Sequence, residues 1–155
     1  MKKVISGFIA FIAGLIIGAS AVGCLKNKTI MNNNKMIDKF KKYYKLLNQW
    51  MILKNNGNSL KSNLEKYGYK TIAIYGMGEI GNRLYEDLKN TGVNVLYAID
   101  KEAGSKYSEI EVVTTEDILK EVDAIIVTPV FDFNKIEEEL SDKTSIKIIS
   151  LEDIL

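Results

Sequence analysis

Three glycines in the spacing G-x-G-x-x-G are the residues of this sequence best suited to bind a ligand. They lie between an apolar run, Thr71–Tyr75, and an amphipathic run that ends near Gly92. In a strand–turn–helix unit the first glycine permits the tight turn, the second lets a pyrophosphate approach, and the third allows close helix packing. The free amides and the dipole of the helix N-terminus then favour the phosphates. The predicted phosphate-binding loop comprises Gly76, Met77, Gly78, Glu79, Ile80 and Gly81.

A carboxylate follows at the distance that a dinucleotide-binding unit requires. The apolar run Val93–Ile99 ends on Asp100, 19 residues after Gly81, where an acid accepts hydrogen bonds from a ribose diol. A further predicted strand, Asp123–Thr128, is stopped by Pro129. Asp100, Thr128 and Pro129 therefore complete the candidate cofactor site. The alternatives are that the loop is a tight turn kept for packing and that Thr128 and Pro129 only end a strand.

The remaining pattern predicts a small doubly wound α/β domain. It adds to the strands above a short helix at Ser59–Tyr67, a strand at Ile110–Val113, a helix at Glu116–Lys120 behind the capping box Thr114–Asp117, a helix at Asp132–Leu140 and a strand at Ile146–Ile149. Right-handed crossovers and one switch point give a five-stranded parallel sheet in the order 3-2-1-4-5.

Charge and composition narrow the possible functions. The net charge of +1 over 155 residues hides a partition, because residues 26–70 carry eleven lysines and two acids, whereas residues 71–155 carry eighteen acids and eight basic residues. So acidic a domain is not suited to nucleic acid. One cysteine and no histidine exclude a disulfide framework and a Cys/His zinc site, so no metal is predicted. They also remove the commonest general base, and no catalytic residue is assigned.

The N-terminal segment predicts a transmembrane helix. Val4–Leu25 is 22 residues without a charge, long enough as a helix to cross the hydrocarbon core. Three alternatives are open: cleavage after Ala19–Ala21 would give a secreted protein, lipidation at Cys24 a lipoprotein, and no processing an anchor. The lysines that follow the segment favour a single-pass anchor in the cell membrane with the C-terminal domain in the cytoplasm.

Two further patterns precede the α/β domain. Small residues recur at every fourth position in Ser6, Ala10, Gly14 and Gly18, which favours self-association in lipid unless it is ordinary anchor composition. A second helix, Met36–Lys54, carries an apolar stripe of Ile37, Phe40, Tyr44, Leu47 and Met51, widened by Tyr43 and Trp50. This stripe could pair with its copy in a homodimer, dock on the α/β domain or lie on the bilayer. The expected organisation is a flank (1–3), a transmembrane segment (4–25), a basic linker and helical segment (26–69) and the α/β domain (70–155).

The segment from Ile74 to Leu84, with Val95–Asp100 and Ile110–Ile118, resembles small Rossmann-type domains of bacterial surface-polysaccharide proteins. These are the N-terminal domain of sugar O-acyltransferases and the CoA-binding-like domain of nucleotide-sugar dehydratases. The resemblance covers residues 70–155 and implies that the glycine loop and Asp100 face a nucleotide. Where that family often has a second acid, this chain has Lys101.

Together these features predict a membrane-anchored nucleotide- or dinucleotide-binding module, accessory or regulatory in envelope polysaccharide biosynthesis. The expected cofactor is NAD or NADP, with CoA or a nucleotide sugar as other candidates. The expected partners are the bilayer, a second copy and polysaccharide-biosynthesis enzymes. One alternative is a minimal NAD(P)-dependent oxidoreductase or nucleotide-sugar-modifying enzyme completed by a partner chain, and another is a structural adaptor without ligand. Tyr97 and Lys101 match a dehydrogenase spacing but fall at a strand end, away from a catalytic helix.

Overall fold

The predicted parallel sheet and its strand order are confirmed. The computed structural model describes residues 2–103 and 109–155, with side-chain environments from residue 26 onward except residue 27. Its five strands are all parallel and lie in the order β3-β2-β1-β4-β5. They are β1 (Thr71–Tyr75), β2 (Asn94–Ile99), β3 (Val112–Val113), β4 (Ala124–Val127) and β5 (Lys147–Ser150). The central strands β1 and β4 are almost wholly buried, which their continuous apolar runs require in a sheet covered on both faces.

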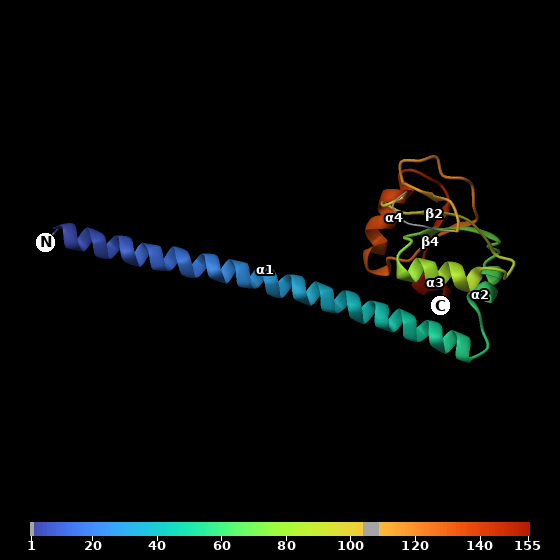
Figure 1. Ribbon diagram of the computed structural model, residues 1–155, viewed down its shortest axis with the longest axis horizontal. Coiled ribbons are helices and arrows are strands. Elements are labelled where there is room, and N and C mark those ends of the chain that lie inside the picture. Colours follow the sequence, from blue (N-terminus) through green and yellow to red (C-terminus); the bar gives the residue numbers. More distant parts are fainter. Residues whose placement is uncertain (1, 104–108) are drawn as a thin grey trace. The chain divides into compact units, whose positions relative to one another are not determined.

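Helices cover both faces of this sheet (Figure 1). Leu84 and Leu88 of α3 (Glu79–Leu88) share a core with Ile72 and Ile74 of β1, together with α2 (Leu60–Lys66). A second core joins the intervening residues of β1 to α4 (Phe133–Ser141). Because neighbouring side chains of a strand point to opposite faces, the two cores lie on opposite sides of the sheet. Two short 3₁₀ turns, η1 (Val130–Asp132) and η2 (Leu151–Ile154), follow β4 and β5.

The predicted transmembrane helix is wrong. Instead of an apolar span, a linker and a second helix, one helix, α1, runs from Lys2 to Asn55. Within the part of the chain that is described, no helix combines the length and the apolarity needed to cross a membrane. The predicted linker at residues 26–34 is helical as well. The ridge of small residues and Cys24 lie outside the residues whose side chains are described.

The chain divides into two compact units, Met1–Lys41 and Lys42–Leu155, so the last turns of α1 belong to the same unit as the sheet. Leu46, Trp50 and Leu53 are buried in the core on the α3 side of the sheet. Their spacing of four and three residues places them on one face of the helix. Polar contacts fix the same face, since Trp50 Nε1 donates to Asp87 Oδ2 at 3.0 Å and Lys54 pairs with the same carboxylate.

Within the second unit, the central residues of the predicted stripe do not dock on the domain. Tyr44, Leu47 and Met51 are 74, 43 and 64% exposed, although they lie on the same helix as buried Leu46 and Trp50. Tyr43 and Trp50, expected to widen the stripe, instead pack against the core of the domain. The helix therefore has two apolar faces, one occupied by the domain and one exposed.

The helix predicted at Glu116–Lys120 is absent, although its capping residues interact. Asp117 Oδ2 accepts from the Thr114 backbone N–H at 2.7 Å, and these hydrogen bonds hold the pKa of the Asp117 carboxyl below its usual range. No helix follows, because the segment offers one partly buried apolar side chain, Leu119, while Ile118 is 97% exposed. Without an apolar face to bury, so short a helix is not stable.

We expect Leu46→Ala to destabilise the domain by about 2–5 kcal/mol, because a fully buried side chain would leave a cavity. Gln49→Ala, at an exposed position three residues further along the helix, is the control and is expected to change stability by less than about 0.5 kcal/mol. Chemical denaturation measures both. Equal stability of the two variants would contradict the assignment of the last turns of α1 to the domain.

Candidate functional site

The glycine loop lies at the carboxyl end of β1, in the centre of the sheet. Gly76 has a φ of 92°, which side chains rarely tolerate, and its N–H donates to Ile99 O at 2.8 Å. A Cβ at this position would meet Pro129 Cδ at 2.8 Å and Thr128 Oγ1 at 2.9 Å. The loop is thereby held between the ends of β2 and β4, at the switch point where ligands of open α/β sheets bind.

Thr128 and Pro129 therefore lie beside the loop, as the sequence predicts. The buried Thr128 Oγ1 lies 2.7 Å from Gly76 O and 3.1 Å from Tyr75 O, within donating distance of both carbonyls. The Thr128 N–H donates to Tyr75 O at 3.0 Å. These contacts give Thr128 a structural task, which is to fasten the loop to β4.

The other two glycines differ sharply in their surroundings. A Cβ at Gly81 would penetrate the carbonyl oxygen of Gly76, so only glycine lets α3 pack this closely against the loop. A Cβ at Gly78 would meet nothing within 4 Å, and no side chain caps the helix that begins at Glu79. The open side of Gly78 is where a phosphate would approach the first-turn amides of α3.

Asp100 is bonded to the loop itself. Its Oδ2 accepts from the Met77 N–H at 2.8 Å, and its Oδ1 accepts from the Glu102 N–H at 2.9 Å. The Met77 side chain is buried in the core below. An ionised carboxylate offers about four acceptor positions, so Asp100 can hold the loop and still accept from ribose hydroxyls.

The first two turns of α3 carry charges of both signs. Glu79 occupies its first position and is exposed, while Arg83, one turn further on, is exposed as well. A carboxylate at a helix N-terminus is favourable to the helix dipole but repels a diphosphate at the same place. Ile80 is partly buried against the core and helps to fix the start of the helix.

Tyr97 and Lys101 do not form a catalytic pair. The Tyr97 ring is buried and its hydroxyl donates to Lys120 O at 2.8 Å, while burial and, less strongly, Glu121 raise its pKa to about 12. The Lys101 ammonium lies 3.5 Å from Glu139. Each side chain has a different partner, so their spacing in the sequence carries no chemistry.

One buried polar atom near the site lacks a partner. The Tyr75 ring, at the end of β1, is 4% exposed, and its hydroxyl is the one buried side-chain polar atom without a hydrogen bond among the described residues. Burial, followed by the negative charges of Glu139 and Asp100, raises the pKa of this hydroxyl. The group stays protonated and is a donor at the carboxyl end of the central strand.

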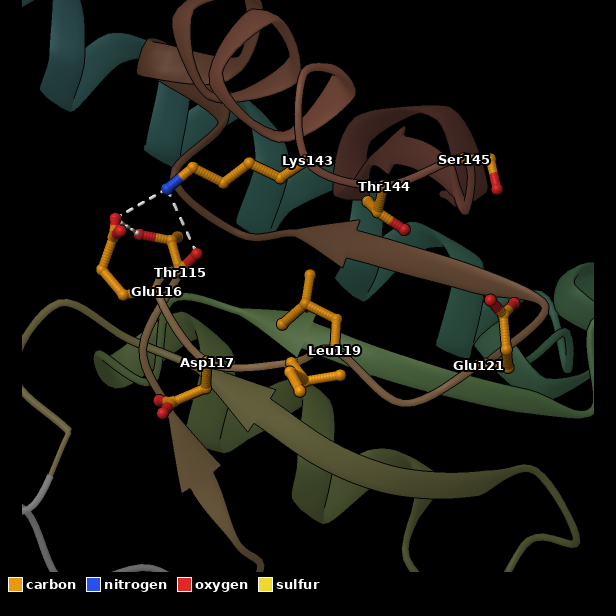
Figure 2. A pocket seen from close by; sticks show the side chains of 9 residues that line it. Thr115, Glu116, Asp117, Leu119, Glu121, Lys143, Thr144 and Ser145 are labelled. Atoms are coloured by element: carbon orange, nitrogen blue, oxygen red, sulfur yellow. Dashed lines mark hydrogen bonds and ion pairs between the residues drawn. The ribbon is translucent and has the colours of Figure 1, made fainter.

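A cavity lined by other residues lies away from the glycine loop. Its volume is about 590 Å³. Figure 2 shows the side chains that line it, which come from the segment that follows β3 and the turn that follows α4. Lys143 crosses one side of it, donating to Thr115 O at 3.2 Å and to Glu116 Oε1 at 2.6 Å. The Lys143 hydrogen bond holds the pKa of the Glu116 carboxyl below its usual range. The Lys143 ammonium has two partners, and no lining residue belongs to the predicted cofactor site.

Residues 29–143 match the model of the family described as D-isomer specific 2-hydroxyacid dehydrogenase, NAD binding domain. The chain belongs to this family. The match covers α1 from residue 29 onward, the helices α2, α3 and α4, and the strands β1 to β4. Neither a curated protein nor a solved structure matches the chain.

Membership confirms the predicted Rossmann-type domain and its NAD(P) cofactor. The more specific resemblance to surface-polysaccharide proteins is not shown. Docking of α1 on the domain was one of the alternatives predicted from the sequence, but the face formed by Leu46, Trp50 and Leu53 was not predicted. The sequence did contain a signal for this face, because Leu46, Trp50 and Leu53 are spaced by four and three residues and so form a second apolar face of the helix.

The surroundings of Gly81 and Gly78 predict different responses to one added methyl group. Gly81→Ala is expected to destabilise the domain by at least about 1–3 kcal/mol, because the loop and α3 must move apart. Gly78→Ala is expected to stay within about 0.5 kcal/mol, since that side is open and its φ of −75° suits any residue. Thermal unfolding of both proteins tests this, and similar losses would contradict the described packing.

Removing the unpartnered hydroxyl should stabilise the protein without ligand. We expect Tyr75→Phe to raise the free energy of unfolding by about 1 kcal/mol, because a desolvated hydroxyl without a partner is lost. Tyr97→Phe is the matched control and should lower it by about 0.5–1.5 kcal/mol, since its hydroxyl is bonded. Denaturant titrations measure both, and a loss of stability in Tyr75→Phe would show that its hydroxyl has a partner.

Proposed function

We propose that this domain is the cofactor-binding part of an NAD-dependent oxidoreductase whose substrate site is completed by a partner chain. The observation that carries the proposal is the open face at Gly78, beside a carboxylate at Asp100, in a domain of an NAD-binding family. The alternative enzyme reading of the sequence thus receives more support than a role in polysaccharide biosynthesis.

The loop supplies the contacts that a dinucleotide needs. The amides of the first turn of α3 would receive the pyrophosphate on the open side of Gly78. Asp100, held in place by the Met77 and Glu102 N–H groups, would accept from the ribose diol. Thr128 and Pro129 hold the turn and border the same edge of the sheet.

Charge at the ribose position supports NAD over NADP. A 2′-phosphate would lie next to the Asp100 carboxylate, and the two negative charges would repel each other. Lys101 is the nearest cation in sequence, but its ammonium is paired with Glu139. A surface pair of this kind is weak, so it reduces the attraction of Lys101 for a 2′-phosphate without abolishing it.

A bound nicotinamide would supply hydride transfer. These 155 residues supply no histidine to move the accompanying proton. Two carboxylates near the loop already have contacts within the protein, since Asp100 accepts from two backbone N–H groups and Glu139 pairs with Lys101. Binding and orientation of the cofactor are therefore the tasks proposed for this chain, and the proton donor is proposed to come from the partner.

Isothermal titration should show one NAD per chain and at least tenfold weaker binding of NADP. Gly78→Val should weaken NAD binding at least tenfold, because the side chain fills the approach to the amides, while leaving thermal stability unchanged. Glu138→Val, at an exposed position on α4, is the control and should bind NAD as the unsubstituted protein does.

Other results would assign the site differently. Tighter binding of CoA or of a nucleotide sugar than of NAD would contradict the NAD assignment. Absence of binding by all of these ligands would favour the structural adaptor. Association with a bilayer or with polysaccharide-biosynthesis enzymes, and a cytoplasmic position of the domain, stay predictions.

A further inference from the structure

We propose that the exposed stripe of α1 is a homodimer interface and that it pairs in parallel with the same stripe of a second copy. Within the second unit the stripe consists of Tyr44, Leu47 and Met51, all exposed. The proposal is independent of what the glycine loop binds.

The two apolar faces of α1 are far enough apart for one to pack against the domain while the other contacts a partner. At about 100° per residue, the directions of Tyr44, Leu47 and Met51 lie roughly 130° around the helix from those of Leu46, Trp50 and Leu53. The second group is buried against the domain. A partner on the stripe therefore does not displace the packing that holds α1 to the sheet.

The spacing of the stripe points to a helix as its partner. Leu47 and Met51 follow Tyr44 by three and seven residues, and the sequence continues the pattern backward to Phe40, Ile37 and Ile30. In the first unit these three side chains are exposed as well. Apolar residues repeated at intervals of three and four over three heptads are the seam of a coiled coil, in which like seams interdigitate.

The flanks of the seam favour a second copy. In a parallel pair the flanking positions that face each other would join Thr29 to Asn34 and Met36 to Lys41, with no pair of like charges, while Tyr43 further along packs against its own domain. Most lysines of this segment lie on outward positions. The repulsion between like charges that two lysine-rich helices could cause is therefore absent from the contact itself.

One polar residue selects the parallel register. Asn33 occupies the seam between Ile30 and Ile37. In a parallel, in-register pair the two Asn33 amides lie side by side and can bond each other. In an antiparallel pair centred on the stripe each amide would face apolar side chains, which leaves a polar group without a partner.

The exposed area suits a modest but specific interface. Phe40 and Tyr44 are 68 and 74% exposed, and the aliphatic seam residues are about half exposed. Together they offer on the order of 500 Å² of apolar surface per copy. Standard interfaces start near 600 Å² per partner, and flanking side chains would add the difference.

The groove beside the stripe extends the contact. It measures about 500 Å³ and is lined by Leu47, Trp50, Met51 and Lys54 of α1 and by Arg83, Glu86 and Asp87 of α3. Two stripe residues form its apolar wall. A helix laid on the stripe would border this groove and the exposed Glu86 that lines it.

Disulfide crosslinking of the full chain tests the interface. In a Cys24→Ser background, Leu47→Cys places a thiol in the seam, and Gln49→Cys places one at an exposed position outside it. Under mild oxidation we expect at least tenfold more covalent dimer from Leu47→Cys. Equal yields, or no dimer from Leu47→Cys, would overturn the proposal.

A second variant separates the dimer from lipid binding. Tyr44→Lys with Met51→Lys, added to the Leu47→Cys chain, should reduce crosslinking to the level of Gln49→Cys and leave thermal unfolding of the domain and NAD binding unchanged. Both side chains are exposed, so the domain should fold. A different result would assign the stripe to the bilayer: the Leu47→Cys chain does not crosslink but sediments with phosphatidylcholine–phosphatidylserine vesicles, and the two lysine substitutions abolish this sedimentation. That result would refute the dimer.

Discussion

The close approach of α3 to the end of β1 is the contact on which the rest of the site depends. A Cβ at Gly81 would overlap the carbonyl oxygen of Gly76, so the helix can begin directly above the turn only because residue 81 is glycine. This packing aims the first-turn amides of α3 across the carboxyl edge of the sheet. Thr128 and Pro129 hold the turn from β4, and the packing of α3 also buries Leu84 and Leu88 against β1.

Asp100 couples that turn to the neighbouring strand. Through the Met77 N–H it connects the end of β2 to the loop, so the residue expected to recognise a ribose also maintains the loop that would bind the phosphates. A substitution at Asp100 therefore affects both tasks and is a poor test of either alone. Gly78 is the better position, because a side chain added there would meet no other atom of the protein within 4 Å.

The long helix α1 has different roles on its two faces. Leu46, Trp50 and Leu53 extend the core of the domain, and the carboxylate of Asp87 on α3 fixes them through Trp50 and Lys54. The stripe that includes Tyr44 and Leu47 stays exposed. The NAD-binding family accounts for the fold of the domain. It does not account for the exposed stripe of α1, because cofactor binding does not require that surface.

The sequence by itself determined the sheet, its strand order and the loop, because apolar runs, glycines and a terminal acid are local signals with fixed spacing. Tertiary structure decided what those signals could not. The Asp117 carboxylate accepts from the Thr114 N–H, but no helix follows, because the Ile118 side chain packs against nothing and is exposed. The helix α1 has two apolar faces, and the periodicity of the sequence does not indicate which of them packs against the domain. Long-range packing buried Leu46 and left Leu47 exposed, because only the first of these adjacent side chains faces the core.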